Sequence, residues 1–156
     1  MKPDLRAAAI SHIALTVFRL NGELLQWGDR LVEPLGLTSA RWQMLGAIAL
    51  ADSPLSAPQV GQAMGVTRQG AQKQLDLLLD QGLLESRPNP AHKRSPLYSL
   101  TPKGQALYAQ ADALWSVQAG QLAASIPAAR LEATTQTLVS ILHHLQTRPF
   151  SLEVES

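Results

Sequence analysis

The sequence contains no cysteine among its 156 residues. Without thiols the chain forms neither a disulfide nor a thiolate metal site. It also lacks any run of about 18 or more uncharged apolar residues, the length that a membrane-spanning helix needs. No signal-peptide pattern is found at its start. We therefore expect a cytoplasmic protein that makes no contact with a membrane.

A large excess of charge of one sign is missing as well. The 13 Lys and Arg residues and the 12 Asp and Glu residues leave a formal net charge of +1. This balance excludes a basic protein that coats nucleic acid, so any affinity for DNA must come from locally placed charge. The hydrophobic share of 46% is enough to bury a core in a chain of this length.

The residue patterns that catalysis and metal binding require are also missing. No arrangement of Ser, His and an acidic residue suggests a nucleophile with its base, and no Gly-rich phosphate loop is found. His143 and His144 are adjacent, so on a helix they point about 100° apart and do not chelate as residues four apart would. We expect no enzymatic activity, no bound metal and no cofactor.

What the sequence does contain is a helix-turn-helix pattern within residues 55–104. Ser56 and Gln59 have the spacing of a capping box at the start of a helix. Gly65 marks a turn, and Thr67 is placed to cap the helix that follows. The apolar positions of this second helix recur at steps of four and three and therefore face inward together: Ala71, Leu75 and Leu78.

The opposite face of the second helix carries amides and a cation. At about 100° per residue, the residues that fall on this face are Gln69, Gln72, Lys73 and Asp76. Each glutamine can pair with adenine through two hydrogen bonds, and Lys73 can reach a guanine edge or a phosphate. An ordinary amphipathic surface helix shows the same division into polar and apolar faces, so the helix alone does not decide between these interpretations.

Gly70 occupies the third position of this helix, where a side chain is usual. Glycine inside a helix costs about 0.5 to 1 kcal/mol relative to alanine. Its presence suggests that the DNA backbone or the preceding helix approaches closely at this point.

The segment after the second helix indicates two strands joined by a basic tip. Strand-like residues lie on either side of a turn at residues 88–90. Between Ser86 and Ala111 the charged residues are all basic: Arg87, Lys93, Arg94 and Lys103. A run of charge is usually a solvated face, but adjacent Lys93 and Arg94 beside a helix-turn-helix are better explained by contact with phosphates and the minor groove.

The order of helix, turn, helix and wing, ending in RPNPAHKRSPLYSLTPKG, resembles the multiple-antibiotic-resistance regulator (MarR) family of bacterial transcription factors. The wing of that family typically carries an Asp, one residue and an Arg, followed by a strand that ends in Leu-Thr and a Lys-Gly pair. Arg94 matches the arginine, and the exit matches at Leu100, Thr101, Lys103 and Gly104. His92 stands in place of the aspartate. A neutral imidazole cannot form the ion pair that braces the wing, so we expect the unbound wing to be mobile.

The resemblance covers essentially the whole chain in length and helix order, with motif-level matches over residues 55–104. It implies a mainly α-helical fold with a small β-wing in a single chain, 1–156. The expected winged helix-turn-helix core is 37–101, with helical dimerisation segments at 4–35 and 102–147.

The first helix of this scheme starts at Pro3 and Asp4 and ends at Gly36. Its apolar stripe is wide enough for burial on two sides, against its own domain and against a second copy. The last helix starts again at Pro127 and ends at Pro149. An intramolecular helical bundle would show the same periodicity.

Function follows from the resemblance as an expectation: a homodimeric regulator, expected to be a repressor, on a pseudo-palindromic operator. Family members commonly bind a small, often aromatic or anionic, effector between the dimer helices and the winged core. The absence of cysteine excludes the peroxide sensing of some members. The alternative is a winged-helix module that contacts proteins without sequence-specific DNA binding.

Candidate residues follow from the same scheme. The expected DNA-binding residues are Thr67, Arg68, Gln69, Gln72, Lys73, Arg87, His92, Lys93 and Arg94. The candidates for an effector pocket are His12, Arg19 and Trp42, for which ordinary packing and surface charge are an equally good explanation.

Overall fold

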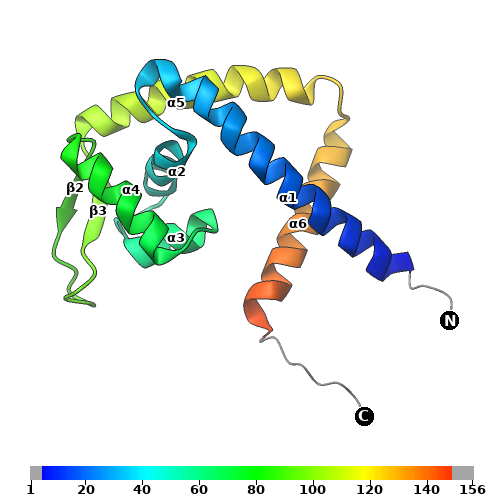
Figure 1. Ribbon diagram of the computed structural model, residues 1–156, viewed down its shortest axis with the longest axis horizontal. Coiled ribbons are helices and arrows are strands. Elements are labelled where there is room, and N and C mark those ends of the chain that lie inside the picture. The colour runs from blue at the N-terminus through cyan, green and yellow to red at the C-terminus, as the bar shows by residue number, and fades with distance from the viewer. Residues whose placement is uncertain (1–4, 149–156) are drawn as a thin grey trace, which may run out of the picture. The chain divides into compact units, whose positions relative to one another are not determined.

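The computed structural model of the protein describes residues 5–148. The chain divides into two compact units, one ending at Trp115 and the other beginning at Ser116, so the boundary falls inside a helix. The elements are α1 (Leu5–Val32), a 3-10 turn η1 (Glu33–Leu35), α2 (Ser39–Ala49), β1 (Leu55–Ser56), α3 (Ala57–Met64), α4 (Arg68–Asp80), β2 (Leu84–Arg87), β3 (Leu97–Leu100), α5 (Pro102–Ala123) and α6 (Ala128–Thr147) (Figure 1). The expected helix start at Pro3 and Asp4 and the expected helix end at Pro149 lie outside the described residues.

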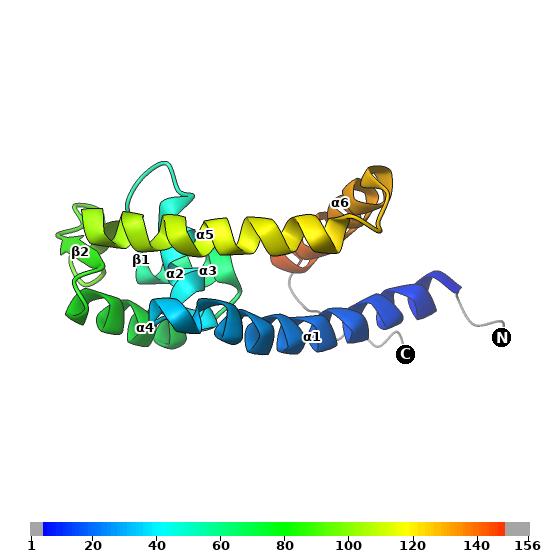
Figure 2. The same cartoon turned by 90° about the horizontal axis from the view of Figure 1, so that it is seen from above.

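The first unit has the predicted arrangement of a helix-turn-helix with a wing. α3 and α4 form the helix pair, and β2 and β3 form a hairpin beside α4 (Figure 1). α2 and α3 lie between α4 and the N-terminal half of α5 (Figure 2). The mainly α-helical fold with a small β-wing is confirmed.

The sheet is antiparallel and has the strand order β1-β3-β2. In the wing hairpin, Leu84 pairs with Leu100 at one end and Arg87 pairs with Leu97 at the other. The third strand, β1, adds a pairing of Leu55 with Tyr98. The sequence did not predict β1 because two residues are too few for the alternation of a strand to show.

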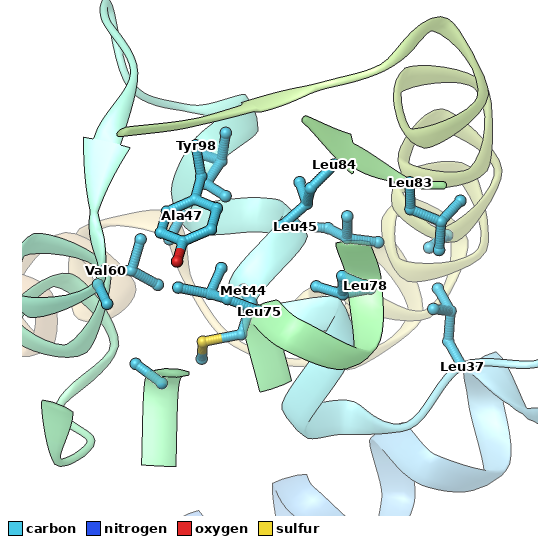
Figure 3. Packing of buried hydrophobic residues seen from close by; sticks show 14 of the residues in the cluster. Leu37, Met44, Leu45, Ala47, Val60, Leu75, Leu78, Leu83, Leu84 and Tyr98 are labelled. Atoms are coloured by element: carbon cyan, nitrogen blue, oxygen red, sulfur yellow. The ribbon is translucent and has the colours of Figure 1, made fainter. Parts of the chain in front are cut away.

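The core of this unit lies where α2, α3, α4 and the sheet meet. Figure 3 shows Tyr98 of β3 packed among side chains of these helices, including Met44 and Leu75. The inward face predicted for α4 is confirmed, since Ala71, Leu75 and Leu78 are all fully buried. In α2, five successive residues from Met44 to Ile48 are buried, so α2 is enclosed on nearly every side rather than on one face.

The predicted helix starts and turns are confirmed by their local hydrogen bonds. The backbone N–H of Ser56 donates to Gln59 Oε1 at 2.8 Å, which is half of the capping box. The N–H of Gly70 donates to Thr67 Oγ1 at 3.0 Å. Gly65 ends α3 with a φ of 66°, a left-handed conformation that favours glycine. These contacts set the angle at which α4 leaves the turn.

α1 is fixed to the winged core at the start of α2. The buried Ser39 donates its hydroxyl to the carbonyl oxygen of Leu25 at 2.6 Å, and its backbone N–H donates to Asp29 Oδ1 at 2.7 Å. A Cβ at Gly28 would overlap the Ser39 hydroxyl, so only glycine lets the two helices approach this closely. The C-terminal part of α1 therefore belongs to the winged core.

Within residues 5–148, no helix combines the length and hydropathy needed to cross a membrane. The same residues contain no group of three or more His, Cys, Asp or Glu side chains that could hold a metal ion.

Candidate nucleic-acid interface

An open surface hollow of about 660 Å³ lies along the outward face of α4. Its lining contains four of the predicted DNA-binding residues together with two acids and a leucine: Arg68, Gln69, Gln72, Lys73, Asp76, Leu77 and Asp80. Gln69 and Lys73 are exposed, as the helical spacing predicted, whereas Gln72 is half-buried. The structure therefore brings these residues onto one surface but gives Gln72 different surroundings.

The amide nitrogen of Gln72 has two hydrogen-bond partners. It donates to Asp76 Oδ1 at 2.8 Å, one helical turn along α4, and to the phenolic oxygen of Tyr98 at 2.9 Å. Tyr98 is only 2% exposed and lies in β3 of the wing. Both N–H groups of this amide are thus used inside the protein, and a two-bond pairing with adenine requires that one of them be released.

At Gly70 the structure contradicts one of the two explanations offered for the glycine, a close approach of the preceding helix. A Cβ built at this position lies 3.1 Å from Thr67 Oγ1, and no atom of the preceding helix lies within 4 Å. The preceding helix therefore does not explain the glycine. The remaining explanations are the tight contact with the capping hydroxyl of Thr67 and an approach of DNA.

The wing tip presents its predicted basic residues to solvent. Lys93 and Arg94 at the tip are exposed, as are Arg87 at the end of β2 and His92. No acid occurs between Ser86 and Ala111, and the nearest one before the tip is Glu85, two residues before Arg87 in β2. The tip is a local positive surface on a nearly neutral protein.

Asn89 holds this tip together. Its Nδ2 donates to the carbonyl oxygen of Ser95 at 2.9 Å, and its Oδ1 accepts the backbone N–H of Ala91 at 3.0 Å. The backbone N–H of Ser95 also donates to the carbonyl oxygen of His92 at 3.0 Å. Sequence reasoning assigned Asn89 only to a turn, although asparagine side chains commonly bond to the backbone two residues on.

A smaller hollow of about 230 Å³ lies where the wing tip faces the starts of α3 and α4. It brings together two predicted DNA-binding residues that are distant in sequence, Arg68 and His92, beside Asn89. The remaining lining is Ser56, Pro58 and Ser95. Two basic side chains around one hollow have the chemistry to receive a phosphate group.

The three candidates for an effector pocket are not brought together in the chain. His12 and Arg19 are exposed on α1, and Arg19 lines an open hollow formed by residues of α1 alone. Trp42 instead lies near the end of α1 that holds Trp27. His12 is fifteen residues before Trp27, which is about 22 Å along a helix.

Trp42 belongs to a cluster of all three tryptophans of the protein. The ring centre of Trp115 in α5 lies 5.8 Å from that of Trp27 and 6.0 Å from that of Trp42, both in edge-to-face geometry. Each ring is half-buried. No spacing rule links residues so far apart in sequence, so only the folded chain reveals this cluster.

Among residues 5–148, a shifted pKa is found for Tyr108. Burial raises the pKa of the Tyr108 hydroxyl in α5 above its ordinary value of 10.0, and the nearby carboxylate of Asp112 adds to the rise. Tyr108 lines a hollow of about 460 Å³ between the end of α2, β3 and α5. This hollow lies apart from the residues of the outward face of α4.

Known proteins resemble this chain in sequence and in fold. The sequence profile described as "MarR family" matches residues 35–95. An uncharacterized protein of Mycobacterium tuberculosis is 36% identical over 129 residues, which cover 83% of this chain and 89% of the relative. A protein of Mycobacterium bovis matches to the same extent.

Solved structures give the same result. The transcriptional regulator PA3341 is 28% identical, with a TM-score of 0.73 over 88% of this chain and 98% of that protein. The M. tuberculosis regulator MosR, solved in complex with DNA, is 25% identical, with a TM-score of 0.68 over 85% and 96% of the two chains. CouR from Rhodococcus jostii, bound to p-coumaroyl-CoA, shares the fold at 22% identity, with a TM-score of 0.72 over 83% and 90%. With its capped helix-turn-helix and wing, the chain belongs to the MarR family of transcription regulators.

Proposed function

We propose that this protein is a homodimeric repressor that binds a pseudo-palindromic DNA operator and releases it when a small effector binds. The observation that carries the proposal is the outward face of α4, where exposed Gln69 and Lys73 lie on the same hollow as Arg68. A capped helix with amides and cations on its free face fits the major groove of DNA.

The wing extends this surface with positive charge. In the proposal, Arg94 enters the minor groove, while Arg87 and Lys93 contact phosphates on either side. Arg68 and His92, which share the smaller hollow, hold a phosphate between the wing and α4. Phosphate contacts fix the register of the protein on the duplex, and the side chains of α4 then read the bases.

A second copy accounts for apolar surface that this chain leaves in water. α6 has no buried residue and exposes Leu131, Leu138, Val139, Leu142 and Leu145. The N-terminal two-thirds of α1 is likewise exposed at Leu5, Ile10, Leu15, Val17, Phe18, Leu20 and Leu24. Continuous apolar surface of this kind marks an interface, and a two-fold dimer buries the same faces of both copies. Two recognition helices then reach half-sites about 34 Å apart.

The dimer is tested by placing a charge on α6. Leu142 is 54% exposed in the single chain, so Leu142→Asp should leave the fold intact and convert the dimer to a monomer. Leu50→Asp is the matched control, because Leu50 is 76% exposed and lies at the end of α2. Light scattering after size exclusion measures both masses. Equal masses for the two variants would contradict an interface on α6.

The effector site that we propose is the tryptophan cluster of Trp27, Trp42 and Trp115. Half-buried aromatic rings offer a stacking surface to an aromatic ligand. CouR, which has the same fold, binds p-coumaroyl-CoA, whose acyl group is aromatic. Such a ligand releases DNA only if it binds the DNA-free arrangement more tightly, by about 1 to 3 kcal/mol for a typical coupling.

Because all tryptophans of the protein are in this cluster, intrinsic fluorescence reports on it directly. Titration with p-coumarate should change the emission, and the same ligand should lower the affinity for DNA. A fluorescence change without an effect on DNA binding would separate the cluster from regulation.

DNA binding itself is tested by selection from a library of random duplexes, followed by mobility-shift assays at two salt concentrations. We expect an inverted repeat to be enriched and to bind at least a thousandfold more tightly than unrelated DNA, about the low end for specific binding. Equal binding to all duplexes would indicate a nonspecific protein. No binding at low salt would favour a module that contacts other proteins.

A further inference from the structure

We propose that Tyr98 and Asp76 fix the side-chain amide of Gln72 so that only its carbonyl oxygen faces DNA. Gln72 then reads any base that offers an amino group, adenine and cytosine alike, rather than adenine alone. This inference rests on the proposed DNA-binding function and specifies how one position of the operator is read.

The geometry of the amide supports the proposal. A glutamine amide nitrogen carries two hydrogens, and that of Gln72 donates to Asp76 Oδ1 at 2.8 Å and to the Tyr98 hydroxyl at 2.9 Å. Its carbonyl oxygen accepts no hydrogen bond from any residue in the described range 5–148, and the side chain lines the hollow on α4. The acceptor is therefore the polar atom that remains for a base.

The chemistry of the partners fixes which way the amide points. An ionised carboxylate only accepts hydrogen bonds, so turning the amide over would set the Gln72 oxygen against the Asp76 oxygen. The Tyr98 hydroxyl is almost completely buried and can either accept or donate a hydrogen bond, so it holds the amide in place without setting its direction. Asp76 therefore sets the orientation, and in that orientation the second N–H points to Tyr98.

The proposal also gives a reason for Asp76. This acid is exposed on the hollow that we assign to DNA, where a negative charge repels phosphates. Its bond to Gln72 accounts for an acid at this place, because a carboxylate holds an amide nitrogen more strongly than a neutral acceptor does. Tyr98 comes from the wing hairpin, so the strand that carries the wing also positions a residue of α4.

The base preference follows from the free acceptor. In the major groove, adenine presents the N6 amino group and cytosine presents the N4 amino group, whereas guanine and thymine present oxygens at the corresponding places. The protein should therefore select adenine and cytosine within about threefold of each other and reject the other two by about tenfold. Adenine alone would be favoured only if an N–H of Gln72 were free for N7.

The experiment is selection from random duplexes with wild-type protein and four variants, followed by sequencing of the bound DNA. Gln72→Ala identifies the position that Gln72 reads, since the preference there should disappear. Tyr98→Phe frees one N–H while keeping the ring in the core, so adenine should gain about tenfold over cytosine at that position. Asp76→Ala frees the other N–H and should shift the same ratio in the same direction.

Tyr108→Phe is the matched control, because Tyr108 lies in α5 outside the α4 hollow. It removes a hydroxyl from a half-buried tyrosine and should leave the ratio of adenine to cytosine unchanged. Circular dichroism checks that each variant is folded. Should Tyr98→Phe fail to fold, Asp76→Ala carries the test, since the Asp76 side chain is exposed.

Two results would overturn the inference while leaving the proposed function standing. One is a wild-type protein that already selects adenine tenfold over cytosine at the position identified by Gln72→Ala. The other is a ratio that stays the same in both Tyr98→Phe and Asp76→Ala. If wild-type protein enriches no sequence at all, the proposed function is itself wrong, and this inference falls with it.

Discussion

Replacing the glycine at position 104 should destabilise the protein, because the start of α5 is packed against a backbone carbonyl. A Cβ built on Gly104 would overlap the carbonyl oxygen of Leu83 and come within 3.4 Å of Leu100 Cδ2. The same Leu83 oxygen accepts the backbone N–H of Thr101 at 3.1 Å. The carbonyl is therefore held in place and cannot turn away from a new methyl group.

The size of the effect comes from two opposing terms. Replacing glycine by alanine in a helix ordinarily gains about 0.5 to 1 kcal/mol. Forcing an extra carbon into a packed site typically costs about 1 to 3 kcal/mol, and overlap with fixed backbone belongs at the upper end of that range. The steric cost is larger, so Gly104→Ala should destabilise the protein by about 2 kcal/mol.

Urea unfolding followed by circular dichroism, at one fixed protein concentration, measures this difference. Gly120→Ala is the matched control on the same helix, because no atom lies within 4 Å of the Cβ it would carry. It should leave stability unchanged or raise it by up to about 1 kcal/mol. A Gly104→Ala protein as stable as the Gly120→Ala protein would refute the steric argument.

Three further outcomes concern DNA binding. Gly70→Ala should weaken operator binding and change the free energy of unfolding of the free protein by no more than about 1 kcal/mol relative to wild type, since the new Cβ meets only Thr67 Oγ1. Unchanged operator affinity in a mobility-shift assay would show that DNA does not approach Gly70. Arg94→Ala should weaken binding to all duplexes alike and reduce the slope of log affinity against log salt concentration by about one. Loss of affinity for the operator alone would indicate that Arg94 contacts a base. His92→Ala should weaken binding to all duplexes alike, because His92 and Arg68 line the hollow that we assign to a phosphate; an unchanged affinity for DNA would exclude the contact.

The family pattern at the end of the wing, from Leu100 to Gly104, has a physical explanation in the contacts made at the start of α5. Thr101 Oγ1 donates to the carbonyl oxygen of Gly82 at 2.8 Å, and Lys103 Nζ donates to that of Gln81, also at 2.8 Å. Together with Gly104 they attach the start of α5 to the end of α4. The sequence only matched these residues to a pattern, whereas the structure shows that they connect the start of α5 to the end of α4.

Local features of the fold were predictable because their causes are local. The caps at Ser56 and Thr67 and the turn at Gly65 each depend on residues within about one helical turn, which a sequence displays directly. The helix pair and the two strands of the wing followed in the same way, from periodicity and turn residues, and the resemblance to the family added the mainly helical class.

Contacts between distant residues were not predictable by the same reasoning. Gln72 and Tyr98 are 26 residues apart, so helical spacing showed that Gln72 faces outward but not that its amide is already bonded. The cluster of Trp27, Trp42 and Trp115 joins three helices, and no period links them. Of its members only Trp42 was proposed as a ligand contact, together with two residues of α1 that lie elsewhere.

The wing tip shows how a departure from the family pattern changes the chemistry of the site. An aspartate in place of His92 would brace the tip through an exposed ion pair, which salt screens and which contributes about 1 kcal/mol or less. Here the bonds from Asn89 to the backbone at Ala91 and Ser95 are neutral and do not depend on salt. They also leave the positive charge of the neighbouring Lys93 and Arg94 uncompensated. Losing the acid removes an ion pair but keeps the bonds of Asn89, so the mobility expected of the unbound wing stays a prediction. The missing acid also strengthens the attraction of the tip for phosphates.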